Sequence, residues 1–257
     1  MKAKKIGVII QARMGSTRLP GKVLKKLYEE DTVLDVLIKR LKLSKKIHEI
    51  IIATTPDICN RQIIEKAVEN DVAWFIGDEK HVLKRYHDAA KAHQLALIIR
   101  LTSDCPFVDP FIIDDMISYY YDHDFDYLRN VDNSTNFSRG FEIEIFSAKV
   151  LYEIYHLAES KLEKEHVTYY IYTHPKKFKI GSYNIKNLKF FEDLRLTIDQ
   201  ENDLILCREV LKRVMEKGFR YNFTVFDVIS IIEQNPQLLE INRDVKHKFV
   251  TNQNLKK

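Results

Sequence analysis

Cysteine is scarce in this sequence. Its only cysteines are Cys59, Cys105 and Cys207, which are odd in number and far apart. They form neither a disulfide framework nor a C-x-x-C metal site, and this favours a reducing compartment. We therefore expect a cytoplasmic protein without structural disulfides.

Long apolar runs and flexible linkers are also missing. The run Ile6–Ile10 follows several lysines, but Gln11 and Arg13 end it too soon for the apolar region of a signal peptide. No apolar stretch in the sequence approaches the length of a membrane span. With only 6 prolines and 7 glycines, the sequence contains no tract that divides the chain. We expect one domain over residues 1–257 and no membrane partner.

Neither charge dominates. The sequence has 41 lysines and arginines against 37 aspartates and glutamates, a net charge of +4 at pH 7. The two signs are interspersed, whereas nucleic-acid-binding proteins concentrate their basic residues on one face or arm. We expect no nucleic-acid partner, and the small positive excess suits an anionic small molecule.

Buried-strand patterns alternate with helical patterns through the first half of the chain. The predicted strands are Ile6–Ile10, Glu49–Ala53, Val72–Phe75 and Leu95–Leu101. The predicted helices are Val33–Leu43, Arg61–Glu69, Val82–Ala92 and Ile112–Tyr121. This alternation predicts an α/β fold, with a mostly parallel sheet covered by helices on both faces.

The second half of the chain has a different pattern. Phe141–Phe146 alternates strictly between apolar and polar residues, which predicts a strand with one solvent-facing side. Phe178–Tyr183 and Phe190–Leu196 also have strand-like composition. We expect a small antiparallel extension of the domain around residues 137–147 and 178–196.

A basic loop with two glycines directly follows the first predicted strand. Residues 11–22 read QARMGSTRLPGK. Ligands of open α/β sheets bind beyond the carboxyl ends of the strands. The glycines allow close backbone approach, and the cations can bind phosphate, so this loop suits a triphosphate better than it suits an ordinary surface turn. Its cations are Arg13, Arg18 and Lys22.

A P-loop is the main alternative for this segment. The Walker A motif requires four residues between its glycines and a serine or threonine after its lysine. Here five residues separate Gly15 from Gly21, and Val23 follows Lys22. The segment is therefore not a P-loop.

Two aspartates follow strand-like runs. Asp104 comes after Leu97–Leu101 and Asp199 after Leu194–Ile198, so both can reach the carboxyl edge of the sheet. Mg²⁺ in proteins usually takes one or two carboxylates and completes its shell with phosphate and water. From spacing alone, an aspartate in such a place is more often a turn former or a helix cap, and both interpretations stay open.

The opening loop and four later segments resemble one family. IIQARMGSTRLPGKVL resembles the start of the spore-coat-polysaccharide type of cytidylyltransferase, which is related to the synthetases of CMP-sialic acids and CMP-3-deoxy-manno-octulosonate. RLTSDCPFVDP, EHVTYYIYTHP, LRLTIDQENDL and NPQLLEIN are similar to later blocks in the same order. The resemblance covers essentially the whole chain.

The resemblance implies a Rossmann-like nucleotidyltransferase. It implies transfer of CMP from CTP to an acidic or phosphorylated sugar, with Mg²⁺ as cofactor, for surface polysaccharide or glycan biosynthesis. The metal, one ion or two, would be bound by Asp104 and Asp199, which with Arg13 and Lys22 would be the catalytic residues. The nucleotide-binding residues that it implies are Gln11, Ala12, Arg13, Gly15, Ser16, Arg18, Lys22, Arg100 and Asp104.

The resemblance also implies an acceptor side and a homodimer. The acceptor-binding residues would be Gly140, Glu142, Glu144, Glu165 and His166. An aspartate is more usual at the position of Glu142, so the identity of the acceptor stays open, and His166 suits a buried structural role equally well. Related enzymes pair through an extension like Phe141–Phe146, and this motivates the homodimer.

Other functions stay possible at this point. A sugar-1-phosphate nucleotidyltransferase that uses another NTP, or a nucleotide-sugar glycosyltransferase, has a similar fold. A non-catalytic nucleotide-binding protein is a third alternative, but the retention of Asp104 and Asp199 argues against it. No Ser-His-Asp or Cys-His nucleophile set is evident, and direct transfer to an acceptor does not need one.

Overall fold

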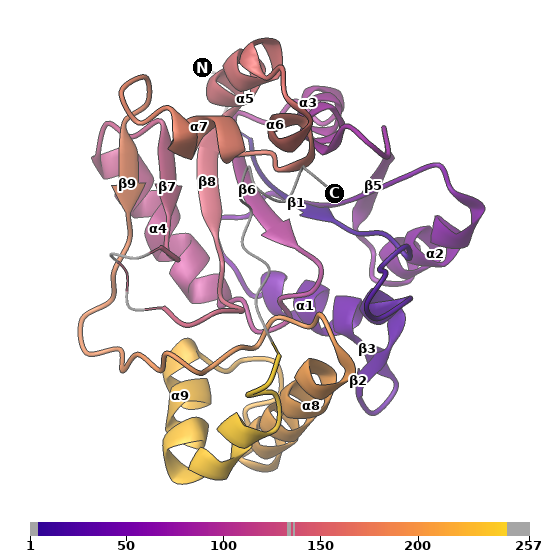
Figure 1. The fold of residues 1–257 in the computed structure, drawn as a ribbon, viewed down its shortest axis with the longest axis vertical. Coiled ribbons are helices and arrows are strands. Elements are labelled where there is room, and N and C mark those ends of the chain that lie inside the picture. Colours follow the sequence, from indigo (N-terminus) through magenta and orange to yellow (C-terminus); the bar gives the residue numbers. More distant parts are fainter. Residues whose placement is uncertain (1–4, 133–134, 136, 246–257) are drawn as a thin grey trace.

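A seven-stranded sheet forms the centre of the protein, in the order β5-β4-β1-β6-β8-β7-β9. The structure is a computed structural model that describes residues 5–132, 135 and 137–245. Helices cover both faces of the sheet (Figure 1). The predicted fold class, a mostly parallel sheet between helices with a small antiparallel part, is confirmed.

The elements agree with the sequence patterns of the first half. The strands of the main sheet are β1 (Ile6–Gln11), β4 (Glu49–Thr54), β5 (Ala73–Ile76), β6 (Leu97–Thr102), β7 (Tyr127–Arg129), β8 (Glu144–Ser147) and β9 (Ile180–Ser182). The helices are α1 (Val33–Leu41), α2 (Arg61–Glu69), α3 (Val82–Ala92), α4 (Pro110–Asp122), α5 (Ala148–Leu157), α6 (Lys161–Glu165), α7 (Tyr169–Thr173), α8 (Glu201–Glu216) and α9 (Val225–Gln234).

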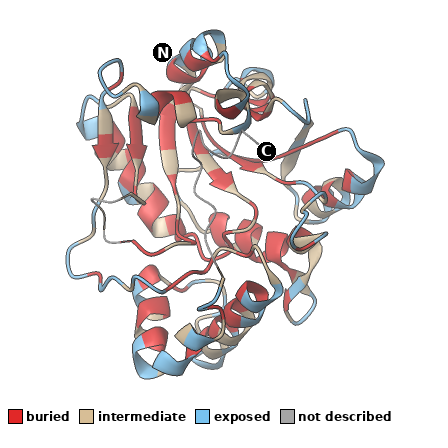
Figure 2. Cartoon of the chain, viewed as in Figure 1, coloured by how far each residue is buried: buried red, intermediate tan, exposed pale blue. Residues whose placement is uncertain are grey.

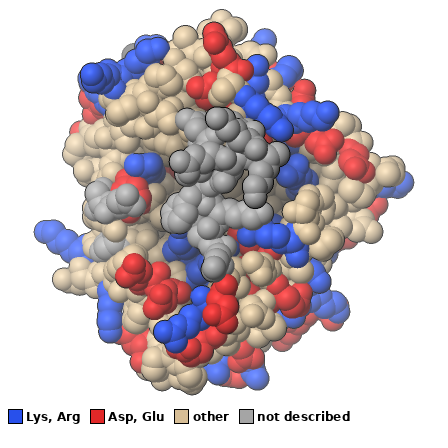
Figure 3. Space-filling model, viewed as in Figure 1, with Lys and Arg blue, Asp and Glu red and all other residues tan. Residues whose placement is uncertain are grey.

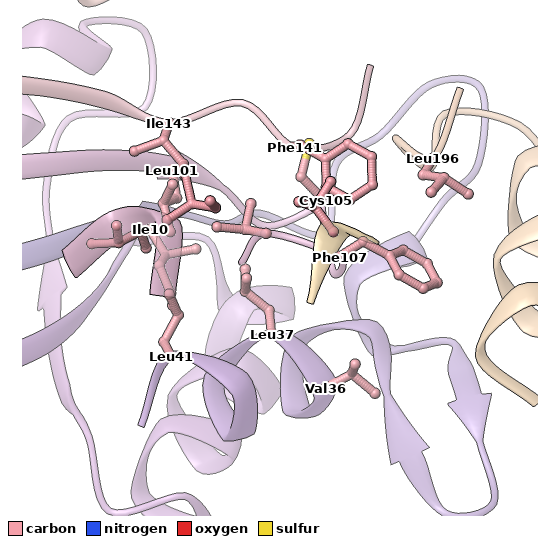
Figure 4. Close-up of a cluster of buried hydrophobic side chains, with 14 of the residues drawn as sticks. Ile10, Val36, Leu37, Leu41, Leu101, Cys105, Phe107, Phe141, Ile143 and Leu196 are labelled. Atoms are coloured by element: carbon pink, nitrogen blue, oxygen red, sulfur yellow. The ribbon is translucent and has the colours of Figure 1, made fainter. Parts of the chain in front are cut away.

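The sheet separates two hydrophobic cores. Successive side chains of a strand point to opposite faces, so Ile10 of β1 packs with α1 and α4 while Ile9 packs with α3 and α5. Figure 4 shows Ile10 and Leu101 of the sheet next to Leu37 and Leu41 of α1. The central strands are buried along nearly their whole length (Figure 2), which explains why they contain continuous apolar runs.

The segments of the expected antiparallel extension, around residues 137–147 and 178–196, join the main sheet and do not form a separate one. Their strands β8 and β9 belong to the main sheet, where β8 is antiparallel to β6 and β7, and β9 is parallel to β7. The separate antiparallel sheet consists of β2 (Lys26–Tyr28) and β3 (Asp31–Thr32). Alternation in the sequence predicted a strand, but it did not predict which strands would be its neighbours.

The strand predicted at Phe190–Leu196 does not form. This stretch contributes only an isolated bridge between Arg139 and Arg195. Leu194 and Leu196 are buried, and the N–H of Leu196 donates to the carbonyl of Arg139 at 2.9 Å. The alternating pattern therefore comes from an extended chain that crosses the core and bonds to a loop.

The segment that motivated the homodimer is buried inside the chain. Its four apolar residues pack in the two cores and offer no apolar surface to a partner. They are Phe141, Ile143, Ile145 and Phe146. The homodimer stays a prediction and now depends on the family resemblance alone.

Two expectations about composition can be compared with the structure. All three cysteines are free, with Cys59 exposed and Cys105 and Cys207 buried. Within the part of the chain that the structure describes, no helix has both the length and the apolar character needed to cross a membrane.

The strand order reverses between β1 and β6. The chain passes outward from β1 to β4 and β5 and then returns to β6 on the other side of β1. Gln11 and Thr102 are register partners at the carboxyl ends of these two strands. Ligands of open α/β sheets bind in the crevice at such a reversal. The opening loop and the segment around Asp104 both start from this point.

Candidate active site

A large cavity lies at this edge of the sheet. Its volume is about 1220 Å³, and the opening loop, α6 and the segments after β5, β6 and β7 line it. All residues predicted for the site line this cavity except Gly140. Over the described residues of the face in Figure 3, basic side chains are interspersed with acidic ones and form no continuous basic stripe.

Lys22 brings the two predicted metal-binding aspartates together. Its Nζ donates hydrogen bonds to Asp104 Oδ2 at 2.7 Å and to Asp199 Oδ1 at 2.9 Å. It also donates to the carbonyl of Ile198 at 2.7 Å, and the N–H of Ile198 donates to the carbonyl of Asp104 at 2.8 Å. The two carboxylates therefore lie on the same side of the sheet, next to one ammonium group.

Opposite charges shift the pKa values of Lys22 and Asp199 in this cluster. Burial lowers the pKa of Lys22, but the charges of Asp104 and Asp199 outweigh this effect, and the pKa lies above its ordinary value. Burial raises the pKa of Asp199, but the neighbouring cations, Lys22 first, outweigh it, and the pKa lies below its ordinary value.

The opening loop is compact but leaves space above it. The N–H groups of Ser16 and Gly21 both donate to the carbonyl of Met14, and Gly21 has a φ of 65°, which glycine adopts without strain. A Cβ at Gly15 would meet no atom within 4 Å, so the packing of the chain does not require a glycine there. The glycine instead keeps the loop surface open toward the cavity.

The other two cations of the loop differ in their partners. Nη2 of Arg18 lies 2.8 Å from Oδ1 of Asp199 and forms an ion pair with it. Arg13 is exposed, lines the cavity and forms no ion pair with any residue that the structure describes. Arg13 is therefore available to a bound anion, whereas Arg18 and Lys22 must first leave the carboxylates.

Arg100 and Glu144 form a partly buried ion pair in the cavity wall. They stand opposite each other in the register of β6 and β8. Glu144 Oε1 also accepts hydrogen bonds from the hydroxyls of Tyr127 and Thr168, the latter at 2.9 Å. Burial raises the pKa of Glu144, but Arg100 outweighs it, and the pKa lies below its ordinary value. Glu144 thus has its partners within the protein.

Glu142 and Asp104 both lie next to the thiol of Cys105. Its Oε2 accepts a hydrogen bond from the N–H of Gly140 at 2.7 Å and lies 3.5 Å from Cys105 Sγ, which in turn is 3.7 Å from Asp104 Oδ1. Burial raises the pKa of Glu142. Gly140 does not line the cavity but orients Glu142, and its φ of 104° and a Cβ contact of 2.6 Å with Leu196 require a glycine.

The predicted residues Glu165 and His166 lie at the end of α6. Glu165 is exposed and His166 is partly buried, and both line the cavity. Burial lowers the pKa of His166, so its imidazole is neutral at pH 7. A neutral imidazole can donate or accept a hydrogen bond, but it does not attract an anion by charge.

The cavity also contains basic residues that the sequence analysis missed. These residues are Lys80, Arg85, Arg129, Arg139, Lys161 and Lys164. Arg129 ends β7 at the same edge of the sheet as Asp104, so a prediction of that short strand would have found it. The others come from helices and loops, where no spacing in the sequence marks a side chain that faces the cavity.

Comparison with known proteins identifies the family. A family model described as Cytidylyltransferase matches residues 7–244. The chain belongs to this family. Members of the family and their structural neighbours are nucleotidyltransferases, and so is this protein.

Two similar proteins support the assignment to this family. The spore coat polysaccharide biosynthesis protein SpsF of Bacillus subtilis is 34% identical over 234 residues, which are 89% of this chain and 94% of that one. A solved cytidylyltransferase structure from Leptospira borgpetersenii has a TM-score of 0.85 and 32% identity, over 96% of this chain and 100% of that one.

A more distant neighbour shares the fold alone. It is CMP:2-keto-3-deoxy-manno-octonic acid synthetase, solved in complex with CTP. Its TM-score is 0.63 at 15% identity, over 82% of this chain and 99% of that one. The fold therefore extends to enzymes with little remaining sequence similarity.

Proposed function

We propose that the protein transfers CMP from CTP to an acidic or phosphorylated sugar and releases pyrophosphate, in the biosynthesis of a surface polysaccharide or glycan. The observation that carries the proposal is the cluster of Lys22, Asp104 and Asp199 beside a cationic loop at the reversal of strand order. Two relatives support it: one is named for polysaccharide biosynthesis, and one, of the same fold, was solved with CTP.

Mg²⁺ is the proposed cofactor, and Asp104 and Asp199 are its proposed protein ligands. Two carboxylates fit Mg²⁺, which completes its shell with phosphate and water. The described residues contain no group of three or more His, Cys, Asp or Glu side chains that could hold a metal. Phosphate oxygens and water would complete the shell of an ion bound by these two carboxylates. Bound magnesium, as one ion or two, would neutralise phosphate charge.

The cationic loop is the proposed site of the triphosphate. Charge-assisted hydrogen bonds from arginine and lysine to phosphate are among the strongest in proteins. Arg13 has no ion pair among the described residues, and a triphosphate has the negative charge to attract Arg18 and Lys22 away from the carboxylates. Gln11, Ala12 and Ser16 line the same part of the cavity and complete the proposed nucleotide side.

The proposed reaction is a direct in-line transfer. An oxygen of the acceptor attacks the α-phosphorus of CTP, and the bond from that phosphorus to the oxygen bridging to the β-phosphorus breaks, so that pyrophosphate leaves. Arg13 and Lys22 hold the phosphates in position and stabilise the charge that develops on them. No covalent intermediate on the enzyme is required.

The acceptor is proposed to bind on the side of β7, β8 and α6. This side carries Glu142, Glu165 and His166 together with a set of basic side chains. Basic side chains favour an acceptor that carries a carboxylate or a phosphate. The basic residues of this side are Arg129, Arg139, Lys161 and Lys164.

A matrix assay tests this function. The purified protein is incubated with each of four NTPs and Mg²⁺ against a panel of sugar acids and sugar phosphates, and pyrophosphate release is measured. We expect release with CTP and with an anionic sugar, and little with the other nucleotides. A clear preference for a purine nucleotide would contradict CMP transfer and favour a nucleotidyltransferase of different specificity.

A binding assay distinguishes a catalytic protein from one that only binds nucleotides. CTP with Mg²⁺ should raise the melting temperature more than ATP, GTP or UTP, because a ligand at 100 times its Kd stabilises the folded state by about 2.7 kcal/mol. Stabilisation by CTP without pyrophosphate release from any acceptor would favour the non-catalytic alternative.

We also propose that the protein is a cytoplasmic homodimer. The three free cysteines suit a reducing compartment, and the family resemblance suggests pairing. Light scattering at micromolar concentration should give the mass of two chains of 30.4 kDa. A strict monomer would remove the dimer from the proposal without affecting the reaction.

A further inference from the structure

A buried polar network lies behind Asp199, on the side away from the cavity. Arg195 pairs with Asp199 Oδ2, and its Nε lies 3.3 Å from Asp203 Oδ1. Asn242 Nδ2 donates to Asp203 Oδ1 at 2.8 Å and to the carbonyl of Arg195 at 2.9 Å. Arg195, Asp203 and Asn242 are all buried.

Three cations hold Asp199, and they are not equivalent. Lys22 and Arg18 bind Oδ1 and line the cavity, whereas Arg195 binds Oδ2 and is not among the residues that line it. The first two are the groups that the proposed function assigns to the triphosphate. When they turn to the phosphates, Arg195 is the cation that stays with Asp199.

Asp203 fixes both Arg195 and the backbone of Asp199. Its Oδ2 accepts hydrogen bonds from the N–H groups of Asp199 and Gln200, each at 2.9 Å, at the start of α8. Its Oδ1 faces Arg195 and Asn242. One fully buried carboxylate therefore sets the position of the main chain and of the guanidinium that holds the Asp199 carboxylate.

We propose that Arg195, held by Asp203, is a positioning residue that keeps Asp199 directed at Asp104 once the nucleotide has drawn Lys22 and Arg18 away. With Oδ2 bound to Arg195, Oδ1 faces the cavity and is free to bind a cation. This inference rests on the proposed function, because it concerns the metal that arrives with the nucleotide.

The test measures metal binding rather than turnover. Mn²⁺, which suits the same carboxylate ligands as Mg²⁺, is titrated into the full-length protein and followed by electron paramagnetic resonance. The titration is made with and without α,β-methylene-CTP, which cannot release pyrophosphate. Partners that orient metal ligands typically change metal affinity by about 10- to 100-fold when they are lost. We expect Asp203→Asn to weaken Mn²⁺ binding in the presence of the analogue by at least about tenfold.

The chain offers a matched control in the neighbouring helix. Asp227 forms the same kind of capping box at the start of α9, where it accepts from the N–H and the hydroxyl of Thr224 at 2.8 and 2.7 Å. It does not line the cavity. Asp227→Asn therefore reproduces the loss of a helix cap without disturbing Arg195, and should leave Mn²⁺ binding within about twofold.

A second variant keeps the proposal testable if Asp203→Asn unfolds. Arg195→Lys preserves the charge but lacks the planar fork that reaches two carboxylates, so it should also weaken Mn²⁺ binding. Where both variants fold, the double variant Arg195→Lys/Asp203→Asn should bind Mn²⁺ about as weakly as either single one, since the two residues act as a unit.

The outcomes distinguish a failure of the proposed metal site from a failure of the positioning role of Arg195. No binding of Mn²⁺ to the wild-type protein with the analogue would contradict the proposed metal site itself. Binding to the wild type that survives in Asp203→Asn and Arg195→Lys, to the same extent as in Asp227→Asn, would overturn the positioning role and leave the proposed function intact.

Discussion

The proposed nucleotide side and the proposed acceptor side of the cavity are built in opposite ways. On the proposed nucleotide side, Asp104 and Asp199 face the cavity, and two of their cationic partners, Lys22 and Arg18, line it as well, where a bound phosphate could attract them. On the acceptor side, Glu144 also lines the cavity, but Arg100, Tyr127 and Thr168 already occupy its oxygens. A charged residue in a cavity wall is thus a candidate for ligand binding only when its present partners can be exchanged.

Among the basic residues of the cavity, the cations of the opening loop should have the largest effect on activity. Arg13→Ala and Lys22→Ala should each lower kcat/KM by roughly 10²- to 10³-fold, the range found when a preorganised charge stabiliser is removed. Pyrophosphate release measures the effect, and circular dichroism should show a retained fold because neither side chain belongs to the two hydrophobic cores.

The control for this prediction is Lys26→Ala. Lys26 follows the same loop, but it is exposed, pairs with Glu30 and does not line the cavity. Its replacement should leave activity unchanged. Activity near the wild-type level in both Arg13→Ala and Lys22→Ala would mean that the loop is an ordinary surface turn.

The acceptor side should respond in stability rather than in chemistry alone. Glu144→Gln removes one partner of the partly buried pair and leaves the Arg100 charge uncompensated, which should cost about 1–3 kcal/mol, less than the loss of a partner in a fully buried pair. Urea unfolding measures the loss. Glu165→Gln, in the same wall but exposed, should change the unfolding free energy by no more than about 0.5 kcal/mol. Equal effects of the two variants would contradict the distinction between the two residues.

The pH dependence of stability sharpens the same comparison. The pKa of Glu144 is depressed in the folded protein below its ordinary value of 4.5. Its ionised form therefore stabilises the fold above about pH 4.5, and this contribution is lost as the pH falls through the lower, folded pKa. Urea unfolding of the wild type and Glu144→Gln should give a difference in unfolding free energy that shrinks below about pH 4.5. A difference that stays constant into the acid range would argue against an ionised Glu144.

The sequence predicted which residues lie close together on the proposed nucleotide side better than on the proposed acceptor side, and the reason is physical. Parallel strands end at one edge of the sheet, so a loop after β1 and an aspartate after β6 must lie close together wherever the helices pack. Asp199 was expected to follow a strand at Leu194–Ile198, but an irregular chain leads to it, and its metal-binding role came from the family resemblance. The contact of Lys22 with both carboxylates needed the folded coordinates, because it joins residues 22, 104 and 199.

The acceptor side depends on pairings that no local pattern specifies. Arg100 and Glu144 meet because β8 inserts antiparallel between β6 and β7 in one register, and a shift by one residue would turn Glu144 to the other face. The strand predicted at Phe190–Leu196 was wrong for a related reason. Its alternation reflects burial of an extended chain, which does not require a neighbouring strand.

The central claim is that Asp104 and Asp199 act together in one metal–nucleotide site. The most direct measurement compares pyrophosphate release by Asp104→Asn, Asp199→Asn and the double variant over a range of Mg²⁺ concentrations. Each single variant should nearly abolish turnover, and the double variant should be little worse, because residues that act as a unit are strongly non-additive. High Mg²⁺ should partly rescue a single variant but not the double one. Wild-type turnover in Asp199→Asn, or losses that multiply in the double variant, would contradict a shared site.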